Sequence, residues 1–403
     1  MVEREFIDCI HEELSRPGTC GVGYNSLRFD DEVTRYTLYR NFHDPYAREW
    51  QNGNSRWDII DMVRAAHALR PEGIEWPLRE DGQPSFRLED LTAANGIAHA
   101  AAHDALSDVH ATIALARLVK ERQPRLYDYV LNNRDKRSVQ AHLDVAAMKP
   151  VLHVSGMFGA ARNNIALIVP LAPHPVNRNE VICFDLGADP QPLFELDADT
   201  LRERLYMRTE ELPEGTERLG IKSVHINKCP ILVTAKMADT ATAQRLGISG
   251  DSCRQHLAAL RAFRDRHPAV LEDKLQAVYA QNRFEPETDP DRMLYGGGFF
   301  SDADKRVMDR VRACTPEELA QQSFPFEDAR LPEMLFRYRA RNYPESLSPE
   351  ERVLWEEFRF QRLTDPASGA SICMEQYQQT IESLLARGDL TAAQQELMHG
   401  LLE

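Results

Sequence analysis

The stretch Ala-His-Asp-Ala-Leu-Ser-Asp at residues 102–108 decides how this chain is interpreted. It places His103 five residues before Asp108, where a long helical pattern begins. A second acid, Asp30, lies upstream, in front of another helical pattern. Carboxylates hold Mg²⁺ or Mn²⁺, and a histidine can take a proton from an attacking water. Two acids and a histidine in this arrangement therefore indicate a two-metal phosphodiesterase.

Each of these residues also has a simpler explanation. An Asp in front of a helix, such as Asp30, is commonly an N-cap. Asp108 could be a solvated first-turn acid that the helix dipole favours, and His103 could be a loop or capping residue. Because His103 precedes the helix and Asp108 lies one turn into it, the two side chains can still converge on one pocket. Asp104 is predicted to be the helix cap rather than a metal ligand.

Longer motifs surround the candidate acids. Asn25, Phe29 and Asp30 form Asn-x-x-x-Phe-Asp, and residues 103–108 form His-Asp-Ala-Leu-Ser-Asp. On these motifs the chain resembles the bacterial exodeoxyribonuclease I family, single-strand 3′→5′ exonucleases of the DEDDh group, whose second and third motifs they match. The resemblance covers essentially the whole chain. It includes the segments Asn54–Asp58, Ala68–Gly73, Pro84–Glu89, Met148–Pro150, His153–Gly159 and His225–Pro230.

The resemblance implies a cofactor and a reaction. Asp30 and Asp108 would hold metal together with two further acids, with two Mg²⁺ ions per site in the complete enzyme and Mn²⁺ as the alternative. One metal lowers the pKa of a bound water, and the other stabilises the leaving 3′-oxygen. His103 would remove the proton of that water. The implied function is degradation of single-stranded DNA from 3′ to 5′ into 5′-mononucleotides, in DNA repair and recombination.

The first motif of the group, Asp-x-Glu on the opening strand, is expected to be absent. Residues 5–15 predict a helix that lies well past that strand in the family. Residues 30–32 match the pattern Asp-x-Glu, but Asp30 already belongs to the second motif. One segment cannot supply the carboxylates on both sides of the metal site. We therefore expect a ribonuclease-H-like domain that is truncated at its N-terminus. The sequence does not decide whether this form is catalytically active. The alternatives are a non-catalytic fragment that binds single-stranded DNA and a partner, or a proofreading-type exonuclease, against which the sequence beyond residue 150 argues.

Substrate-binding residues follow from the same resemblance. Arg87 would contact the terminal nucleotide or its phosphate, which suits a forked guanidinium. Aromatic rings that hold a single strand contribute about 1–3 kcal/mol per stacked base without sequence preference. The alternative for the aromatic residues is ordinary packing. The residues implied to hold the strand are Arg35, Tyr46, Trp50, Arg64, Asn179, Lys222 and His225.

A partner site is also implied. The family docks the acidic, apolar C-terminal tail of single-stranded-DNA-binding protein, and Arg70, Tyr129 and Lys149 would receive it. A basic pocket beside an aromatic ring suits such a tail. The alternative is three unrelated surface residues.

The composition sets limits on these interpretations. A net charge of −15 opposes nucleic-acid binding at long range, although local basic patches and a bound Mg²⁺ change the local sign. No apolar run approaches the roughly 20 residues of a membrane span. The first residues, Met-Val-Glu-Arg-Glu, do not open a signal peptide. The seven cysteines are scattered without a Cys-x-x-Cys pair, so a reducing, cytoplasmic location is expected, and the family default is a monomer.

Three domains are predicted along the chain. Alternating strand and helix patterns predict an α/β layer fold, identified by the resemblance as the ribonuclease-H-like exonuclease domain of residues 1–122, without its first strands. Strand patterns follow over 123–278, where the resemblance implies an SH3-like β-barrel domain, and helical patterns predict an α-helical C-terminal domain over 279–403. The predicted strands are 18–24, 151–155, 164–169, 180–185 and 231–234. The predicted helices are 5–15, 30–42, 56–69, 90–95, 104–121, 302–313, 332–343, 349–362, 372–386 and 391–402, with a linker at 285–291.

Overall fold

The computed structural model of the chain describes residues 1–98, 104–280 and 286–402. These residues divide into two compact units. The first, here called the helical unit, consists of Met1–His11, Arg35–Pro45 and Pro286–Glu403. The second, here called the sheet unit, consists of Glu12–Thr34 and Tyr46–Glu285. Helices α1 (Glu3–Ser15) and α2 (Asp30–Arg40) contribute residues to both units.

A two-stranded parallel sheet opens the sheet unit. Strand β1 (Cys20–Gly23) pairs with β2 (Ser55–Asp58), so that Gly23 lies opposite Asp58. The strand predicted at 18–24 is confirmed, but the helix predicted from residue 56 is wrong at its start. Residues 56–58 are buried, and continuous burial is typical of a parallel strand covered on both faces. The helix, α3 (Ile60–Leu69), begins only after this strand.

Four helices pack beside this small sheet: α3, α4 (Leu88–Ala94), α5 (Ala105–Arg122) and α6 (Pro124–Asn132). They share one hydrophobic core with Leu152, Val154 and Val233, which belong to the larger sheet described next, here called the barrel. The burial of α5 differs from its sequence pattern. Among its larger apolar residues, Leu115 is fully buried, whereas Leu106, Val109 and Ile113 are 63%, 53% and 43% exposed. The buried stripe consists of Ala111, Leu115 and Val119, spaced four residues apart along the helix.

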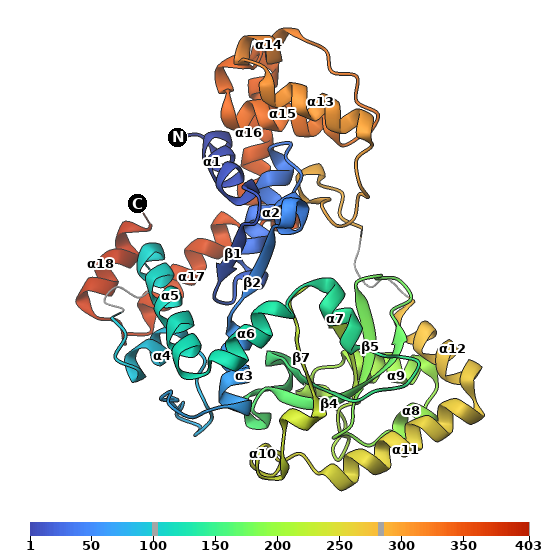
Figure 1. Cartoon of the computed structure of the whole chain (residues 1–403). Coiled ribbons are helices and arrows are strands. Elements are labelled where there is room, and N and C mark those ends of the chain that lie inside the picture. Colours follow the sequence, from blue (N-terminus) through green and yellow to red (C-terminus); the bar gives the residue numbers. More distant parts are fainter. Residues whose placement is uncertain (99–103, 281–285, 403) are drawn as a thin grey trace. The chain divides into compact units, whose positions relative to one another are not determined.

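A five-stranded antiparallel sheet with the order β6-β5-β4-β3-β7 forms the centre of the second half of the sheet unit (Figure 1). The strands predicted near residues 151, 164, 180 and 231 are confirmed, and β6 was not predicted. One face of the sheet packs against α7, and the other packs against α8, α9, α11 and α12. The bounds are β3 (Val151–Val154), β4 (Ile165–Pro173), β5 (Glu180–Asp185), β6 (Ile221–His225), β7 (Ile231–Thr234), α7 (Lys136–His142), α8 (Gln191–Glu195), α9 (Ala198–Tyr206), α10 (Thr240–Arg245), α11 (Gly250–Arg266) and α12 (Pro268–Tyr279).

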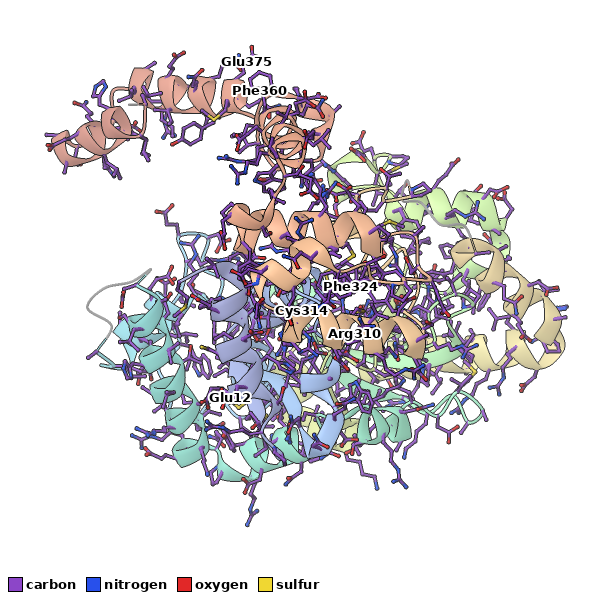
Figure 2. The ribbon with its side chains drawn as sticks, turned by 90° about the horizontal axis from the view of Figure 1, so that it is seen from above. Glu12, Arg310, Cys314, Phe324, Phe360 and Glu375 are labelled. Carbon is purple, nitrogen blue, oxygen red and sulfur yellow. The ribbon has the colours of Figure 1, made fainter. Side chains whose placement is uncertain are left out.

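The helical unit contains the predicted C-terminal helices. Its core includes Leu331, Met334 and Tyr338, and the guanidinium carbon of Arg310 lies 5.7 Å from the centre of the Phe324 ring (Figure 2). The predicted helices are confirmed with shifts of a few residues at their ends. The bounds are α13 (Asp302–Ala313), α14 (Pro316–Gln321), α15 (Leu331–Asn342), α16 (Pro349–Thr364), α17 (Met374–Ala386) and α18 (Ala392–Gly400). In the described part of the chain, no helix has the length and apolar character that crossing a membrane requires.

Candidate active site

Asp30 begins helix α2, directly after a tight turn that leaves strand β1. Asn25 adopts a left-handed conformation with φ of 59°, and a short 3-10 helix (Ser26–Arg28) follows it. The Asp30 side chain is exposed, in the first helical turn, where the helix dipole favours negative charge. The turn therefore places an exposed carboxylate just beyond the end of strand β1.

Asp58, at the end of β2, holds this turn in place. Its Oδ1 accepts hydrogen bonds from the backbone N–H groups of Asn25 at 2.8 Å and Ile60 at 3.1 Å, and its Oδ2 accepts one from Leu27 at 3.2 Å. Burial raises the pKa of the Asp58 carboxyl, and the three N–H donors oppose that rise. Asp58 ends the family segment Asn54–Asp58, but no sequence motif predicts a role for it.

The neighbouring acid, Asp31, faces the opposite environment. It is buried, and it accepts from Nη2 of Arg48 at 2.6 Å and from Nη1 of Arg56 at 3.2 Å. Glu49 lies 3.2 Å from Nε of Arg56 and completes a group of two acids and two arginines. Two adjacent acids thus separate into a buried ion-pair partner and an exposed carboxylate, Asp30.

The second candidate acid lies in the first turn of α5. Asp104 is the N-cap of this helix, and its carboxylate accepts from the Ser107 N–H at 3.0 Å, so the prediction that Asp104 is the cap is confirmed. Asp108 is half-buried one turn further. His103, the predicted general base, lies outside the described residues.

Metal binding has to be judged from these donors. Asp30 and Asp108 offer carboxylate oxygens, the donor type that Mg²⁺ and Mn²⁺ prefer. Among residues 1–98, 104–280 and 286–402, no group of three or more His, Cys, Asp or Glu side chains could hold a metal ion. The described donors have the right chemistry for a hard cation, but they do not complete a site.

Arg87 lies at the N-cap position of α4 and is exposed. The residue before it, Phe86, is fixed by Tyr24, whose hydroxyl donates to the Phe86 carbonyl at 2.6 Å. Tyr24 comes directly after β1, so the end of that strand supports the Arg87 segment as well as the Asp30 turn.

The residues predicted to hold the strand from the first domain differ in exposure. Trp50 is 65% exposed, whereas Tyr46 is half-buried. Arg64 pairs with Asp61 at 2.7 Å. Arg35 is only 5% exposed, and it donates to the Tyr295 hydroxyl at 3.0 Å within the helical unit. Its predicted contact with DNA stays a prediction, and packing is the role that its contacts support.

Glycine allows Arg64 to approach the barrel closely. A Cβ atom added at Gly156 would lie 2.9 Å from Nη1 of Arg64, and Gly159 has a φ of +76° that side chains rarely adopt. Both glycines belong to the segment His153–Gly159. This segment therefore joins α3 to the barrel, in agreement with an architectural role.

Lys222 is the most unusual of the predicted residues in the barrel. It lies on β6, and its Nζ atom is 4.0 Å from the centre of the Phe158 ring, a cation–π contact. This atom is buried, and no hydrogen-bond partner for it lies in the described part of the chain. Burial lowers the pKa of Lys222 to about 8.

The other two predicted barrel residues have polar partners. His225, also on β6, lies 3.3 Å from Glu180, and burial lowers its pKa although the nearby Glu180 opposes that change. Asn179 accepts from Nζ of Lys136 at 2.7 Å.

Two of the three predicted partner-binding residues influence His142, Tyr129 by contact and Lys149 through its charge. The Tyr129 hydroxyl donates to the Leu232 carbonyl at 2.9 Å and lies 3.4 Å from Nε2 of His142. Lys149 is exposed. Burial of His142 lowers the pKa of its ring, and the positive charge of Lys149 lowers that pKa further. Arg70 follows the end of α3 and donates to the carbonyl of the preceding residue.

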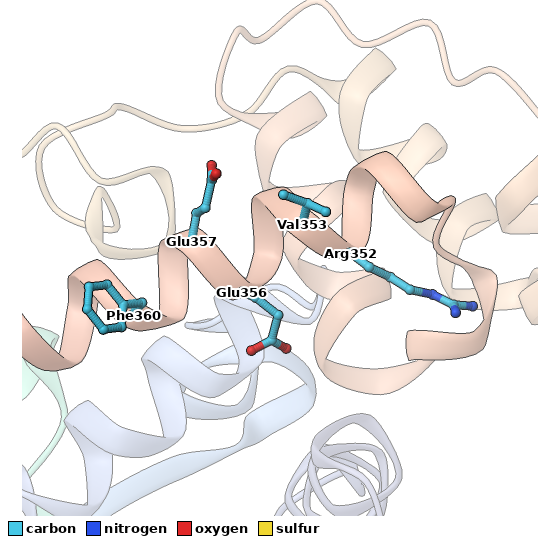
Figure 3. A pocket seen from close by; sticks show the side chains of 5 residues that line it. All are labelled: Arg352, Val353, Glu356, Glu357 and Phe360. Carbon is cyan, nitrogen blue, oxygen red and sulfur yellow. The ribbon is translucent and has the colours of Figure 1, made fainter.

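A hollow on the helical unit is lined by none of the predicted site residues. It has a volume of about 420 Å³ and is lined by residues of helix α16 alone (Figure 3). The side chains of Val353 and Phe360 are 58% and 68% exposed there, with Glu356 and Glu357 between them along the helix.

Three family models match the chain in sequence order. An Exonuclease model matches residues 9–116, an Exonuclease I SH3-like domain model matches 134–281, and an Exonuclease I C-terminal domain model matches 288–403. The chain is therefore a nuclease with a ribonuclease-H-like exonuclease domain, an SH3-like domain and a helical C-terminal domain, which confirms the predicted fold classes. It is 51% identical over 363 residues to exodeoxyribonuclease I of Escherichia coli (strain K12), an alignment that covers 90% of this chain and 75% of that protein. The chain belongs to the exodeoxyribonuclease I family.

Solved structures of relatives agree with this assignment. The zinc-bound crystal structure of an E. coli exonuclease I complex with single-stranded DNA superimposes with a TM-score of 0.92 at 47% identity, covering 99% of this chain and 82% of that one. A crystal structure of SSB/Exonuclease I with the inhibitor CFAM gives a TM-score of 0.85 at 46% identity, covering 99% and 81%.

Proposed function

We propose that this protein degrades single-stranded DNA from the 3′ end and releases 5′-mononucleotides, in DNA repair and recombination. The observation that carries this proposal is the different environment of two adjacent acids. Asp31 is neutralised by buried arginines, whereas Asp30 is exposed after a turn that Asp58 holds in place. The family assignment supports a metal-binding role for that exposed carboxylate. We also propose that the three domains span residues 1–122, 123–278 and 279–403.

The residues of this chain have distinct roles in the proposed reaction. Asp30 and Asp108 would hold divalent metal, Mg²⁺ or Mn²⁺, which when bound supplies an activated water and stabilises the leaving oxygen. His103 removes a proton from the attacking water. Arg87 binds the terminal nucleotide or its phosphate through its guanidinium.

The single strand is held by stacking and by positive charge. Trp50 has the exposure that stacking on a base requires. Lys222 brings a positive charge that no carboxylate neutralises by a direct contact within the described residues, and a phosphate could supply that contact. Arg64, Tyr46, Asn179 and His225 complete the proposed set.

The test is release of 5′-mononucleotides from a 3′-ended single strand with Mg²⁺, compared among the unmodified chain, His103→Ala and Asp108→Asn. Release that both substitutions abolish supports the proposal. An unmodified chain that binds single-stranded DNA but releases no nucleotide would contradict it and favour the alternative, a non-catalytic protein that binds DNA and a partner.

We further propose that Arg70, Tyr129 and Lys149 receive the acidic C-terminal tail of single-stranded-DNA-binding protein. Lys149 is exposed and its charge lowers the pKa of His142, whose ring lies next to Tyr129. Together these residues would offer a positive charge and an aromatic surface to an apolar, acidic peptide. Charge reversal at Arg70 should weaken binding of a tail peptide in a fluorescence anisotropy titration. Unchanged affinity would overturn this assignment.

A further inference from the structure

Three backbone N–H groups converge on one buried carboxylate at the end of β2. Asp58 is 7% exposed, and its two oxygens accept from Asn25, Leu27 and Ile60 at 2.8 to 3.2 Å. Two of these donors belong to the turn that leads to Asp30, and the third belongs to the first turn of α3. The carboxylate therefore ties the turn to β2 and to α3 at once.

The turn has little freedom to relax without this support. A Cβ atom added at Gly23 would lie 2.5 Å from Cβ of Ser26, so the turn folds back closely on the strand before it. Asn25 has a φ of 59°, a conformation that non-glycine residues adopt only where local structure favours it. Only two residues separate Leu27, the last residue of the turn that Asp58 holds, from Asp30.

We propose that Asp58 is a positioning residue, which fixes the Asn25–Leu27 turn and thereby sets the place of the Asp30 carboxylate. The inference rests on the proposed function for the role of Asp30, although the tie between Asp58 and the turn can be tested without it. Residues that hold a metal ligand in place strongly affect metal binding. Their loss typically lowers metal affinity or activity by roughly 10- to 100-fold.

The two oxygens of Asp58 have different partners, which makes asparagine an informative substitution. In Asp58→Asn, the remaining carbonyl oxygen can still accept from Asn25 and Ile60. The new amide group would place its own N–H donors against the N–H of Leu27, so this contact is lost. Asp58→Ala removes all three contacts and leaves three buried donors without acceptors.

Tyr24→Phe is the matched control, because Tyr24 lies in the same stretch of chain and also makes one long-range hydrogen bond. That bond, from the Tyr24 hydroxyl to the Phe86 carbonyl, supports the Arg87 segment and not the Asp30 turn. If Asp58 acts through Asp30, the two variants should affect different properties. Asp58→Asn should alter metal binding and kcat, whereas Tyr24→Phe should alter KM for DNA.

The experiment combines three measurements on the unmodified chain, Asp58→Asn, Asp58→Ala and Tyr24→Phe. Amide hydrogen exchange reports protection at Asn25 and Leu27, a Mn²⁺ titration followed by electron paramagnetic resonance reports metal affinity, and nucleotide release reports kcat and KM. We expect Asp58→Asn to lose protection at Leu27 and to lower Mn²⁺ affinity and kcat by about 10-fold or more, with KM for DNA unchanged. Asp58→Ala should show a larger loss of the same kind.

Two results would overturn the proposal. One is normal protection at Leu27 and normal Mn²⁺ affinity in Asp58→Asn. The other is an equal loss of Mn²⁺ affinity in Tyr24→Phe, which would indicate general loosening of the strand end. If the unmodified chain releases no nucleotide, the proposed function fails, but exchange and Mn²⁺ affinity, compared with Asp30→Asn, still decide whether Asp58 acts on Asp30.

Discussion

Replacing Asp31 by alanine should destabilise the sheet unit far more than removing an exposed acid. Asp31 accepts from Arg48 at 2.6 Å and from Arg56 at 3.2 Å, and none of these three side chains is more than 9% exposed. With Glu49, the group has two negative and two positive charges. Alanine at this position would leave an uncompensated positive charge in a buried place.

The expected loss follows from the cost of an unpaired buried charge. Removing one partner of a buried ion pair costs about 3–5 kcal/mol. Glu49 remains 3.2 Å from Arg56 and 3.8 Å from Arg48, so we expect the lower end, about 3 kcal/mol. Because whole domains are stable by only about 5–15 kcal/mol, this is a large fraction of the free energy of unfolding.

Urea unfolding, followed by far-ultraviolet circular dichroism and tryptophan fluorescence, measures this loss. The control is Asp81→Ala, because Asp81 pairs with Arg79 at 3.2 Å with side chains 52% and 45% exposed. Such an exposed pair contributes about 0–1 kcal/mol. The double variant Asp31→Ala/Arg48→Ala restores neutrality, so it should lose less than the sum of its single variants, with a coupling of about 0.5–3 kcal/mol.

A loss for Asp31→Ala no larger than for Asp81→Ala would refute this reasoning. Strict additivity in the double variant would also refute it, because charge balance would then play no part.

Three further outcomes are expected. Gly23→Ala should lower the urea midpoint, because its Cβ would lie 2.5 Å from Ser26 Cβ, and adding Ser26→Gly should restore part of the loss; no rescue would argue against this contact. Burial lowers the pKa of His67 to about 4 and of His153 to about 3. Since the unfolded chain binds these protons near pH 6.5 and the folded chain does not, stability should fall as pH drops from about 6.5 toward 4. The urea midpoint of His67→Phe should fall less over that range, and an equal fall would contradict the assignment. Affinity for single-stranded DNA should decrease as pH rises through about 8, where Lys222 loses its proton; Lys222→Met should remove that dependence and lower the salt slope by about 0.7, and an unchanged slope would mean that Lys222 contacts no phosphate.

The sequence predicts most helices and strands correctly because their patterns are local. The errors occur where burial depends on distant neighbours. Residues 56–58 follow no alternating pattern, since a parallel strand is covered on both faces. On α5, the larger apolar residues Leu106, Val109 and Ile113 are exposed, whereas the smaller Ala111 is fully buried. Side-chain size and apolarity on a helix do not reveal which face its neighbours cover.

The same limit applies to the candidate site. Asp30 and Asp31 are chemically identical neighbours, and motif register alone favours Asp30. Their separation into an exposed and a buried acid depends on Arg48 and Arg56, which lie 17 and 25 residues away in the sequence. A motif can therefore point to the acid proposed to bind metal, but the partners that neutralise its neighbour are seen only in the folded structure.

The residues that hold the candidate site in place are even harder to predict from local sequence patterns. Asp58 reaches the Asn25 amide across 33 residues, Tyr24 reaches Phe86 across 62, and Arg56 reaches the carbonyl of Asn227 across 171. Each contact needs the parallel pairing of β1 with β2, or the packing of that small sheet against the barrel, to be formed first. A carboxylate that binds metal is recognisable from its motif because the chemistry demands that side chain. A carboxylate that binds backbone N–H groups carries no comparable mark, and for this reason Asp58 emerges only from the folded structure.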